Sequence, residues 1–297
     1  MSESVNYSHL STASDLNLKD YITLLKPKVM TLVVFTGVAS MISAPGFYDS
    51  HPFLIIMSVI ALTLGSGAAG AINMWYDSDI DKVMKRTQSR PVPQGRIQRQ
   101  DALTFGVFVS VASVLLMGLA SNWVAAGILA FANFFYSVIY TMWLKRRTPQ
   151  NIVIGGAAGA FPPLIGWAAV TGSVDIYPMI MFAIIFLWTP PHFWALALFS
   201  DTDYEKAGVP MLPVVAGRKA TQVQMLIYTL LLLPVCLLPW ILGYASNLYA
   251  TGAVILNTLF ILSSIRVFFD EKNTSAVRMF GYSIFYLFAL FLLIILN

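Results

Sequence analysis

The sequence predicts an all-α, polytopic membrane protein with nine transmembrane helices, arranged as two pseudo-repeated four-helix halves plus a ninth helix. Three observations support this fold class. Hydrophobic residues make up 58% of the 297 residues and charged residues only 11%, whereas soluble domains carry about 25% charged residues. Apolar runs long enough to cross a bilayer recur along the chain. An acidic motif also occurs twice. Because the runs are continuously apolar rather than alternating, a β-barrel is disfavoured.

Each expected transmembrane helix is an apolar run of about 20 residues, the length that crosses a ~30 Å hydrocarbon core. The runs lie at 29–46, 53–72, 102–120, 123–143, 151–171, 176–199, 225–245, 247–266 and 275–296. We expect residues 21–297 to form a single transmembrane domain and residues 1–20 to form a cytoplasmic tail. Apolar residues between Leu16 and Leu25 suggest a short helix at the membrane interface, ending before Pro27.

The distribution of basic residues predicts the topology. All 18 Lys and Arg residues lie in the N-terminal tail, in alternate loops, or at the membrane ends that face those loops. Because short cytoplasmic loops retain basic residues, the N-terminus is expected in the cytoplasm and the C-terminus in the periplasm of a bacterial inner membrane. This topology and the lipid bilayer account for the net charge of +4, so no nucleic-acid partner is expected. Cys236 is the single cysteine, and we expect a packed thiol.

The acidic motif supports an internal duplication. Residues 77–82 read Asp-Ser-Asp-Ile-Asp-Lys, and residues 201–206 read Asp-Thr-Asp-Tyr-Glu-Lys, each directly after an even-numbered apolar run. Such repeats fit a bundle whose site lies between its two halves. Glycine- and alanine-rich segments at 65–71 and 155–160 are expected to allow close helix packing.

The first motif has the spacing of a metal site. If the second transmembrane helix continues past the membrane, Asn73, Asp77 and Asp81 form one polar stripe with a four-residue period. Two carboxylates and a carboxamide oxygen suit Mg²⁺, which completes its coordination shell with water and substrate phosphate. The cations that follow are candidates to bind the phosphate groups; they are Lys82, Lys85, Arg86 and Arg90. The alternative is a solvated helix end with pairs such as Asp81–Lys85.

These residues resemble the intramembrane aromatic prenyltransferases, whose first motif reads N-x-x-x-D-x-x-x-D. The resemblance extends from about Tyr21 to the C-terminus and is closest to the family that farnesylates protohaem IX. The segments that carry it are 25–29 (Leu-Lys-Pro-Lys-Val), 73–91, 140–163, 190–197 (Pro-Pro-His-Phe-Trp-Ala-Leu-Ala) and 203–213.

The resemblance implies site residues in several roles. The implied catalytic residues are Asn73, Asp77, Asp81, Asp203 and Tyr204, and the same set without Tyr204 is implied to bind Mg²⁺. The implied substrate-binding residues are Lys28, Lys85, Arg86, Arg90, Tyr140, Lys145, Arg146, Asn151 and His192. In the second motif helical spacing favours Asp201 with Glu205, whereas the resemblance favours Asp203. His192 is interpreted either as a haem-orienting residue or as a buried structural histidine, and Arg146 either as a propionate ligand or as a headgroup anchor.

The implied reaction is attack by a haem vinyl group on farnesyl diphosphate, with addition of water and release of diphosphate. Mg²⁺ is the implied cofactor, and protohaem IX is a substrate rather than a resident cofactor. Haem A synthase or a terminal oxidase assembly pathway are the further partners considered. Two alternatives stay open: a prenyltransferase acting on a quinone precursor, and a membrane transporter. The second fits less well, because the acids cluster at one membrane boundary and not at the bilayer centre.

Overall fold

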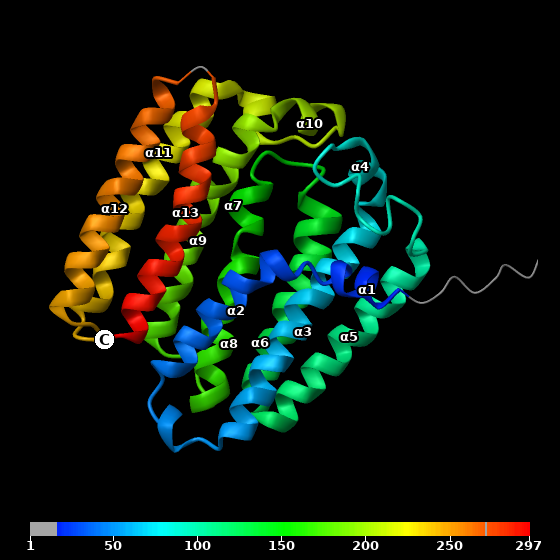
Figure 1. Cartoon of the computed structure of the whole chain (residues 1–297). Coiled ribbons are helices and arrows are strands. Elements are labelled where there is room, and N and C mark those ends of the chain that lie inside the picture. Colours follow the sequence, from blue (N-terminus) through cyan, green and yellow to red (C-terminus); the bar gives the residue numbers. More distant parts are fainter. Residues whose placement is uncertain (1–16, 271) are drawn as a thin grey trace, which may run out of the picture.

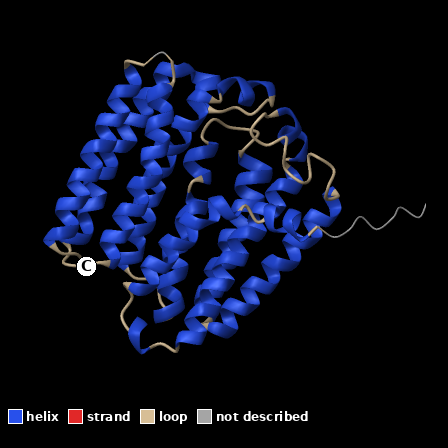
Figure 2. Ribbon diagram, viewed as in Figure 1, coloured by secondary structure: helices blue, strands red, loops and turns tan. Residues whose placement is uncertain are grey.

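The computed structural model describes residues 17–270 and 272–297, and within them all regular secondary structure is helical (Figure 2). The predicted all-α class is therefore confirmed. The elements in chain order are α1 (Leu18–Leu24), α2 (Pro27–Ile42), the 3₁₀ helix η1 (Phe47–Asp49), α3 (Pro52–Tyr76), α4 (Ser78–Val83), α5 (Arg99–Ala120), α6 (Trp123–Phe134), the π-helix η2 (Phe135–Leu144), α7 (Asn151–Gly155), α8 (Ala157–Thr171), α9 (Ile176–Phe199), α10 (Asp201–Lys206), α11 (Leu212–Ile241), α12 (Asn247–Phe268) and α13 (Thr274–Ile295).

The described helices include eight that are long and apolar enough to span a membrane, or nine if the bent pair α1–α2 is counted as one span. The expected nine therefore hold only approximately. The difference lies at the first span, where α2 alone has 16 residues and meets α1 at an angle of 54°. Pro27 begins α2, and Lys26 before it adopts a left-handed conformation with φ 53°, so the chain bends there instead of continuing as one helix.

The helices form a bundle in which the two halves lie side by side (Figure 1). In the first half α3 packs against α5, and α5 against α6; in the second half α11 packs against both α9 and α12. The two halves meet through α8, which packs against α2 and α9, and through α13, which packs against α2. Phe35 on α2 and Phe288 on α13 make one such contact, with ring centroids 4.6 Å apart.

The short interfacial helix expected before Pro27 corresponds to α1, which Asn17 caps by accepting a hydrogen bond from the Lys19 amide at 3.1 Å. The tail residues 1–16 lie outside the described residues, and the limits of the tail and the transmembrane domain remain a prediction. Cys236 is fully buried, as expected, with its sulfur 3.1 Å from the Tyr286 hydroxyl.

Glycines on α3 allow the α1–α2 bend to lie directly on that helix. A Cβ atom at Gly67 would lie 2.9 Å from the Met30 sulfur, and one at Gly70 would lie 3.3 Å from Cδ of Lys26. Real Cβ atoms rarely approach other atoms this closely, so larger residues would push the bend away from α3. The predicted packing role of the glycine-rich segment is confirmed, and its consequence is that Lys26 reaches the end of α3.

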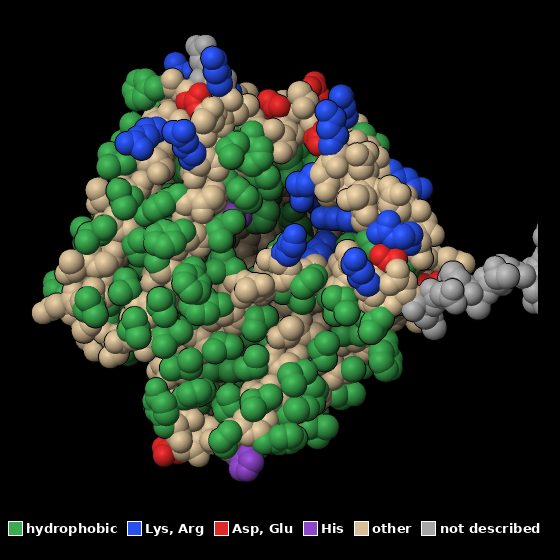
Figure 3. All heavy atoms as spheres, viewed as in Figure 1, with side chains coloured by type: hydrophobic (Ala, Val, Ile, Leu, Met, Phe, Trp, Pro, Cys, Tyr) green, Lys and Arg blue, Asp and Glu red, His purple; other side chains and the backbone are tan. Residues whose placement is uncertain are grey.

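Charged side chains gather at one end of the bundle, around α4 and α10, whereas the C-terminus lies at the other end (Figures 1 and 3).

We expect a membrane-impermeant thiol reagent to label Gln98→Cys only from the cytoplasmic side and Ser173→Cys only from the outside, because basic residues are retained in cytoplasmic loops. Both positions are exposed, and the native Cys236 is buried and gives little background. Labelling of both variants from the same side would contradict this orientation.

Candidate active site

The predicted polar stripe forms at the junction of α3 and α4. Although α3 ends at Tyr76 and α4 begins at Ser78, the helical hydrogen bonds continue: the Asp77 amide donates to the Asn73 carbonyl at 2.9 Å, and the Asp81 amide to the Asp77 carbonyl at 2.8 Å. The three side chains therefore share one face. Their residues are 4%, 0% and 2% exposed in chain order, so the interpretation as a solvated helix end is wrong for both carboxylates.

Burial of two carboxylates requires compensating charge or hydrogen bonds, and the surrounding residues supply both. Lys145 pairs with Asp77, and Arg90 NH1 lies 2.6 Å from Oδ2 of Asp81. The Asn73 amide donates to Oδ2 of Asp77 at 2.7 Å. Lys26 Nζ donates to Oδ1 of Asn73 at 2.5 Å. The stripe is thus enclosed by cations from three separate segments of the first half.

Arg146 forms ion pairs with both the exposed Asp79 and the buried Asp77 of the first motif. Its guanidinium donates two hydrogen bonds of 2.7 Å to Asp79 and lies 3.4 Å from Oδ1 of Asp77. Arg146 also stacks over the Tyr76 ring at 4.8 Å. The hydrogen bond from Arg146 lowers the pKa of Asp79 to about 2, so the stabilisation from this pair is present above the unfolded pKa and is lost only as pH falls towards 2.

The π-helix η2 and the residue that follows it bring Thr141 and Lys145 to the stripe. Its wider turns are visible in the hydrogen bond from the Lys145 amide to the Tyr140 carbonyl, five residues back, at 2.9 Å; such segments are often found at functional sites. Thr141 Oγ1 accepts from Asn73 at 3.1 Å. A Cβ atom at Gly155 would lie 2.1 Å from the Tyr140 ring, so only glycine at this position leaves room for that ring.

Asn151 begins α7 and is fully buried. Its side-chain amide donates to the Lys145 carbonyl at 3.2 Å, and its Oδ1 has no hydrogen-bond partner among the described residues. Asn151 therefore holds the backbone at Lys145 and presents one free acceptor.

The second acidic motif, on α10, lies against the first. Oδ2 of Asp203 accepts a hydrogen bond of 3.1 Å from the Lys85 amide, directly after α4. Beneath it Tyr204 is buried in a cluster with Ile80, Met84 and Ile152. Asp201 and Glu205 are exposed, whereas Asp203 is partly buried. The two echoed motifs, 124 residues apart in the chain, thus meet in space, as the duplication predicts.

The donor chemistry of the stripe fits Mg²⁺. Its side-chain oxygens come from two carboxylates and one carboxamide, the hard ligands that Mg²⁺ prefers, and few protein ligands suffice because this ion keeps several waters. Among the described residues no three His, Cys, Asp or Glu side chains lie close enough to hold one ion together. The predicted metal ligands Asp77, Asp81 and Asp203 therefore do not form one cluster in the described chain. An ion at the stripe would complete its shell with water and with substrate oxygens.

The remaining predicted residues differ in how close they come to the stripe. Within the described chain, the side chains of Lys28, Lys85 and Arg86 are exposed and make no hydrogen bond or ion pair with the stripe. His192 lies in the second half, on α9, where its Nδ1 is 2.6 Å from Oγ of Ser283 on α13.

Sequence reasoning missed Lys26 and Thr141. The signal for Lys26 was its place directly before Pro27, where the chain bends towards α3.

We expect Lys26→Met to lower turnover by roughly tenfold or more, because the variant removes a cation held against Asn73 where diphosphate charge would be stabilised. Lys28→Met is the matched comparison, since Lys28 lies two residues away and is exposed. Steady-state turnover of both purified variants, in the reaction that the resemblance implies, checks this. A larger loss for Lys28→Met would support the original prediction for Lys28 and contradict the role of Lys26.

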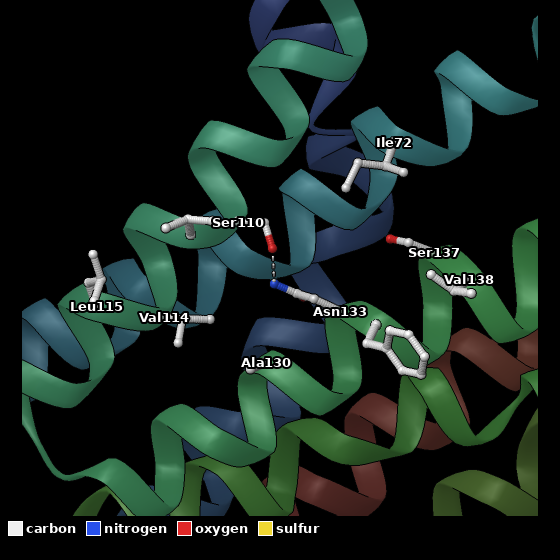
Figure 4. Close-up of a pocket in the computed structure, with 10 residues that line it drawn as sticks. Ile72, Ser110, Val114, Leu115, Ala130, Asn133, Ser137 and Val138 are labelled. Atoms are coloured by element: carbon white, nitrogen blue, oxygen red, sulfur yellow. Dashed lines mark hydrogen bonds between the residues drawn. The ribbon is translucent and has the colours of Figure 1, made fainter.

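Two recesses on the surface differ in chemistry. Figure 3 shows a hollow bordered by Lys and Arg side chains on one side and by hydrophobic side chains on the other. A separate groove of about 380 Å³ lies between α3, α5, α6 and η2, and its lining is apolar except for Ser110, Asn133 and Ser137 (Figure 4). Asn133 donates to Ser110 at 2.9 Å. Because this groove contains no charged side chain, it does not suit a diphosphate.

The family model and the similar curated proteins both indicate a prenyltransferase. The model of the UbiA prenyltransferase family matches residues 32–293. The chain is 56% identical to a protoheme IX farnesyltransferase of Granulibacter bethesdensis, over 92% of this chain and 88% of the relative. It is 54% identical to a protoheme IX farnesyltransferase of Rhodopseudomonas palustris, over 96% of this chain and 91% of the relative.

Solved structures share the fold. A structure concerned with digeranylgeranylglyceryl phosphate synthase matches with a TM-score of 0.77 and 21% identity, covering 94% of this chain and 97% of that one. A UbiA homolog from Archaeoglobus fulgidus, bound to DMAPP and Mg²⁺, matches with a TM-score of 0.65 and 16% identity, covering 92% and 99%.

Proposed function

Because this chain belongs to the UbiA prenyltransferase family, we propose that it transfers a farnesyl group from farnesyl diphosphate to a vinyl group of protohaem IX, giving hydroxyethylfarnesyl haem (haem O) and releasing diphosphate. The choice of acceptor rests on relatives that are more than 50% identical over most of their length and are named protoheme IX farnesyltransferase. Transfer of an allylic group is also the chemistry for which the first motif is suited.

The observation that carries the proposal is the buried stripe of Asn73, Asp77 and Asp81 among Lys26, Arg90 and Lys145. Breaking an allylic C–O bond leaves negative charge on the departing diphosphate, and preorganised cations stabilise that charge best where water is excluded. Mg²⁺, when bound, supplies Lewis-acid stabilisation of the leaving group. Asn73, Asp77 and Asp81 would hold it, with Asp203 from the second motif on the facing side.

The cations have two roles in this proposal. In the free protein Lys145 and Arg90 neutralise the carboxylates. With substrate bound, the same side chains bind diphosphate oxygens, together with Lys85 and Arg86 from the exposed segment that follows α4. Tyr140, whose ring lies against Gly155, and Tyr204, which is buried next to Asp203, are the aromatic side chains that would stabilise the developing allylic cation. Asn151 positions Lys145 through its backbone contact.

The charge distribution supports an orientation in the membrane. We place the acidic motifs and the N-terminus on the cytoplasmic side of a bacterial inner membrane, because the loops at that end carry the basic residues. Both substrates would then reach the site from the cytoplasmic side or from that leaflet.

A competition assay between two candidate acceptors, protohaem and 4-hydroxybenzoate, tests which one receives the farnesyl group. Purified protein with Mg²⁺ and labelled farnesyl diphosphate receives protohaem and 4-hydroxybenzoate together. Label in a haem product heavier by a farnesyl group plus water is the expected result. Label in 4-hydroxybenzoate, with unmodified haem, would instead assign the protein a quinone precursor as its acceptor.

A further inference from the structure

The imidazole ring of His192 is fixed by aromatic contacts on both faces and by a hydrogen bond at one nitrogen. Its ring stacks between Trp188, at a centroid distance of 4.4 Å and an angle of 19°, and Phe280, at 4.7 Å and 24°. Its Nδ1 lies 2.6 Å from Oγ of Ser283. The Ser283 carbonyl in turn accepts from the Trp188 indole at 2.9 Å. These contacts from α9 and α13 fix both the plane and the rotation of the imidazole.

The hydrogen bonds of Ser283 determine the tautomer of His192. The Ser283 hydroxyl lies 2.6 Å from the Phe280 carbonyl oxygen. A contact this short between two oxygens requires a proton between them, and only the hydroxyl carries one. That proton is therefore not available to His192. Nδ1 of His192 must donate to Oγ of Ser283, which leaves Nε2 of the neutral ring as a bare lone pair.

The lone pair on Nε2 has no partner among the described residues, yet it is reachable. His192 retains 8% of its surface, and Nε2 is not one of the buried polar atoms that lack a hydrogen bond. A histidine with only a structural role normally satisfies both nitrogens. An imidazole that donates one N–H to a fixed oxygen and presents the other nitrogen has the arrangement of a metal-binding histidine, in which the donated hydrogen bond sets tautomer and orientation.

His192 lies on α9 close to the residues that pack under the two acidic motifs. It lies seven residues before the end of α9 at Phe199, about 10 Å along the helix axis. The next residue, Phe193, packs against the cluster of Ile80, Met84 and Tyr204 that lies directly beneath the two acidic motifs. His192 is therefore adjacent in the chain to a residue that packs under the acidic motifs.

We propose that Nε2 of His192 is an axial ligand to the iron of the protohaem substrate and that Ser283 positions it. This inference rests on the proposed function, because that function supplies the haem. Coordination at the ring centre leaves the vinyl groups at the ring edge free to face the farnesyl chain. The iron takes no part in bond formation; the bond from Nε2 to iron serves to place the acceptor.

Spectroscopy of the full-length protein tests the ligand directly. Protohaem is titrated into the purified wild type, His192→Gly and the matched control His51→Gly, without farnesyl diphosphate. Resonance Raman spectra of the ferrous complexes are then recorded for an iron–histidine stretch. We expect this band in the wild type and in His51→Gly, and its loss in His192→Gly with a haem affinity at least about tenfold weaker. Added imidazole should restore the axial-ligand spectrum in His192→Gly.

Ser283→Ala provides a second variant that decides the question if His192→Gly does not fold. Without the acceptor on Nδ1, the stretch should shift and haem affinity should fall roughly 10–100-fold, as for other residues that orient metal ligands. Identical spectra and affinities in the wild type and the folded variants would overturn the assignment. Wild-type protein that farnesylates haem but shows no iron–histidine band would overturn it while leaving the proposed function intact. Failure of the wild type to farnesylate haem would count against the proposed function itself.

Discussion

Asp77→Asn is expected to lower farnesyl transfer by roughly 10²–10³-fold, the effect of removing one preorganised electrostatic group from an active site. Asp77 is fully buried and pairs with Lys145. The substitution keeps the size of the side chain and one oxygen acceptor but removes the negative charge that would hold Mg²⁺ against the diphosphate. Turnover of the purified variant over a range of Mg²⁺ concentrations measures this, and high Mg²⁺ should restore part of the activity.

Asp175→Asn is the control for that variant. Asp175 lies between α8 and α9, at the end of the bundle away from the motifs, and accepts a hydrogen bond of 2.8 Å from the Trp167 indole. An amide oxygen can still accept this bond, so near-normal activity is expected. If Asp77→Asn instead turned over at the wild-type rate with normal Mg²⁺ dependence, the stripe would not be the metal–diphosphate site.

Arg90→Leu is expected to destabilise the protein as well as to inactivate it. Arg90 compensates Asp81, whose side chain is 3% exposed. Removing one partner of a buried ion pair leaves an uncompensated charge and costs about 3 kcal/mol or more when both partners are buried. Because 21% of the Arg90 side chain is exposed, we expect a smaller cost of about 2 kcal/mol. Thermal unfolding in detergent, followed by size-exclusion chromatography, measures it as a lowered apparent Tm.

The double variant Arg90→Leu/Asp81→Asn separates stability from catalysis. With the carboxylate also neutralised, the apparent Tm should recover most of its loss, but activity should remain at the level of the less active single variant. A double variant as unstable as Arg90→Leu alone would show that Arg90 stabilises the fold through contacts other than Asp81.

The parts of the site that sequence predicts are those governed by a single helix. Asn73, Asp77 and Asp81 share a face because the helical period places residues four apart together, and the chain keeps this period through the junction of α3 and α4. The two motifs meet because a duplicated chain places equivalent segments at equivalent ends of the two halves. The membrane spans follow likewise from length and hydropathy.

The parts that escaped prediction depend on contacts between segments or on irregular backbone. Lys26 reaches Asn73 because it adopts a left-handed conformation before Pro27 and because Gly70 leaves space on α3. Pro27 marks the bend in the sequence, but the contact of Lys26 with Asn73 depends on how the bend packs against α3. The π-helix that aims Thr141 and Lys145 at the stripe has the apolar composition of an ordinary transmembrane helix. Composition likewise does not show that Lys145 and Arg90 would pair with the carboxylates in the free protein.

Binding of a spectroscopically visible metal tests the central claim, that the buried stripe of Asn73, Asp77 and Asp81 holds a divalent ion together with the prenyl diphosphate. Mn²⁺ replaces Mg²⁺ in purified protein, and its bound fraction is measured by electron paramagnetic resonance with and without a non-hydrolysable farnesyl diphosphate analogue. We predict strong Mn²⁺ binding to the wild type only when the analogue is present, and little binding to Asp77→Asn under either condition. Equal analogue-dependent binding by the wild type and Asp77→Asn would contradict the claim.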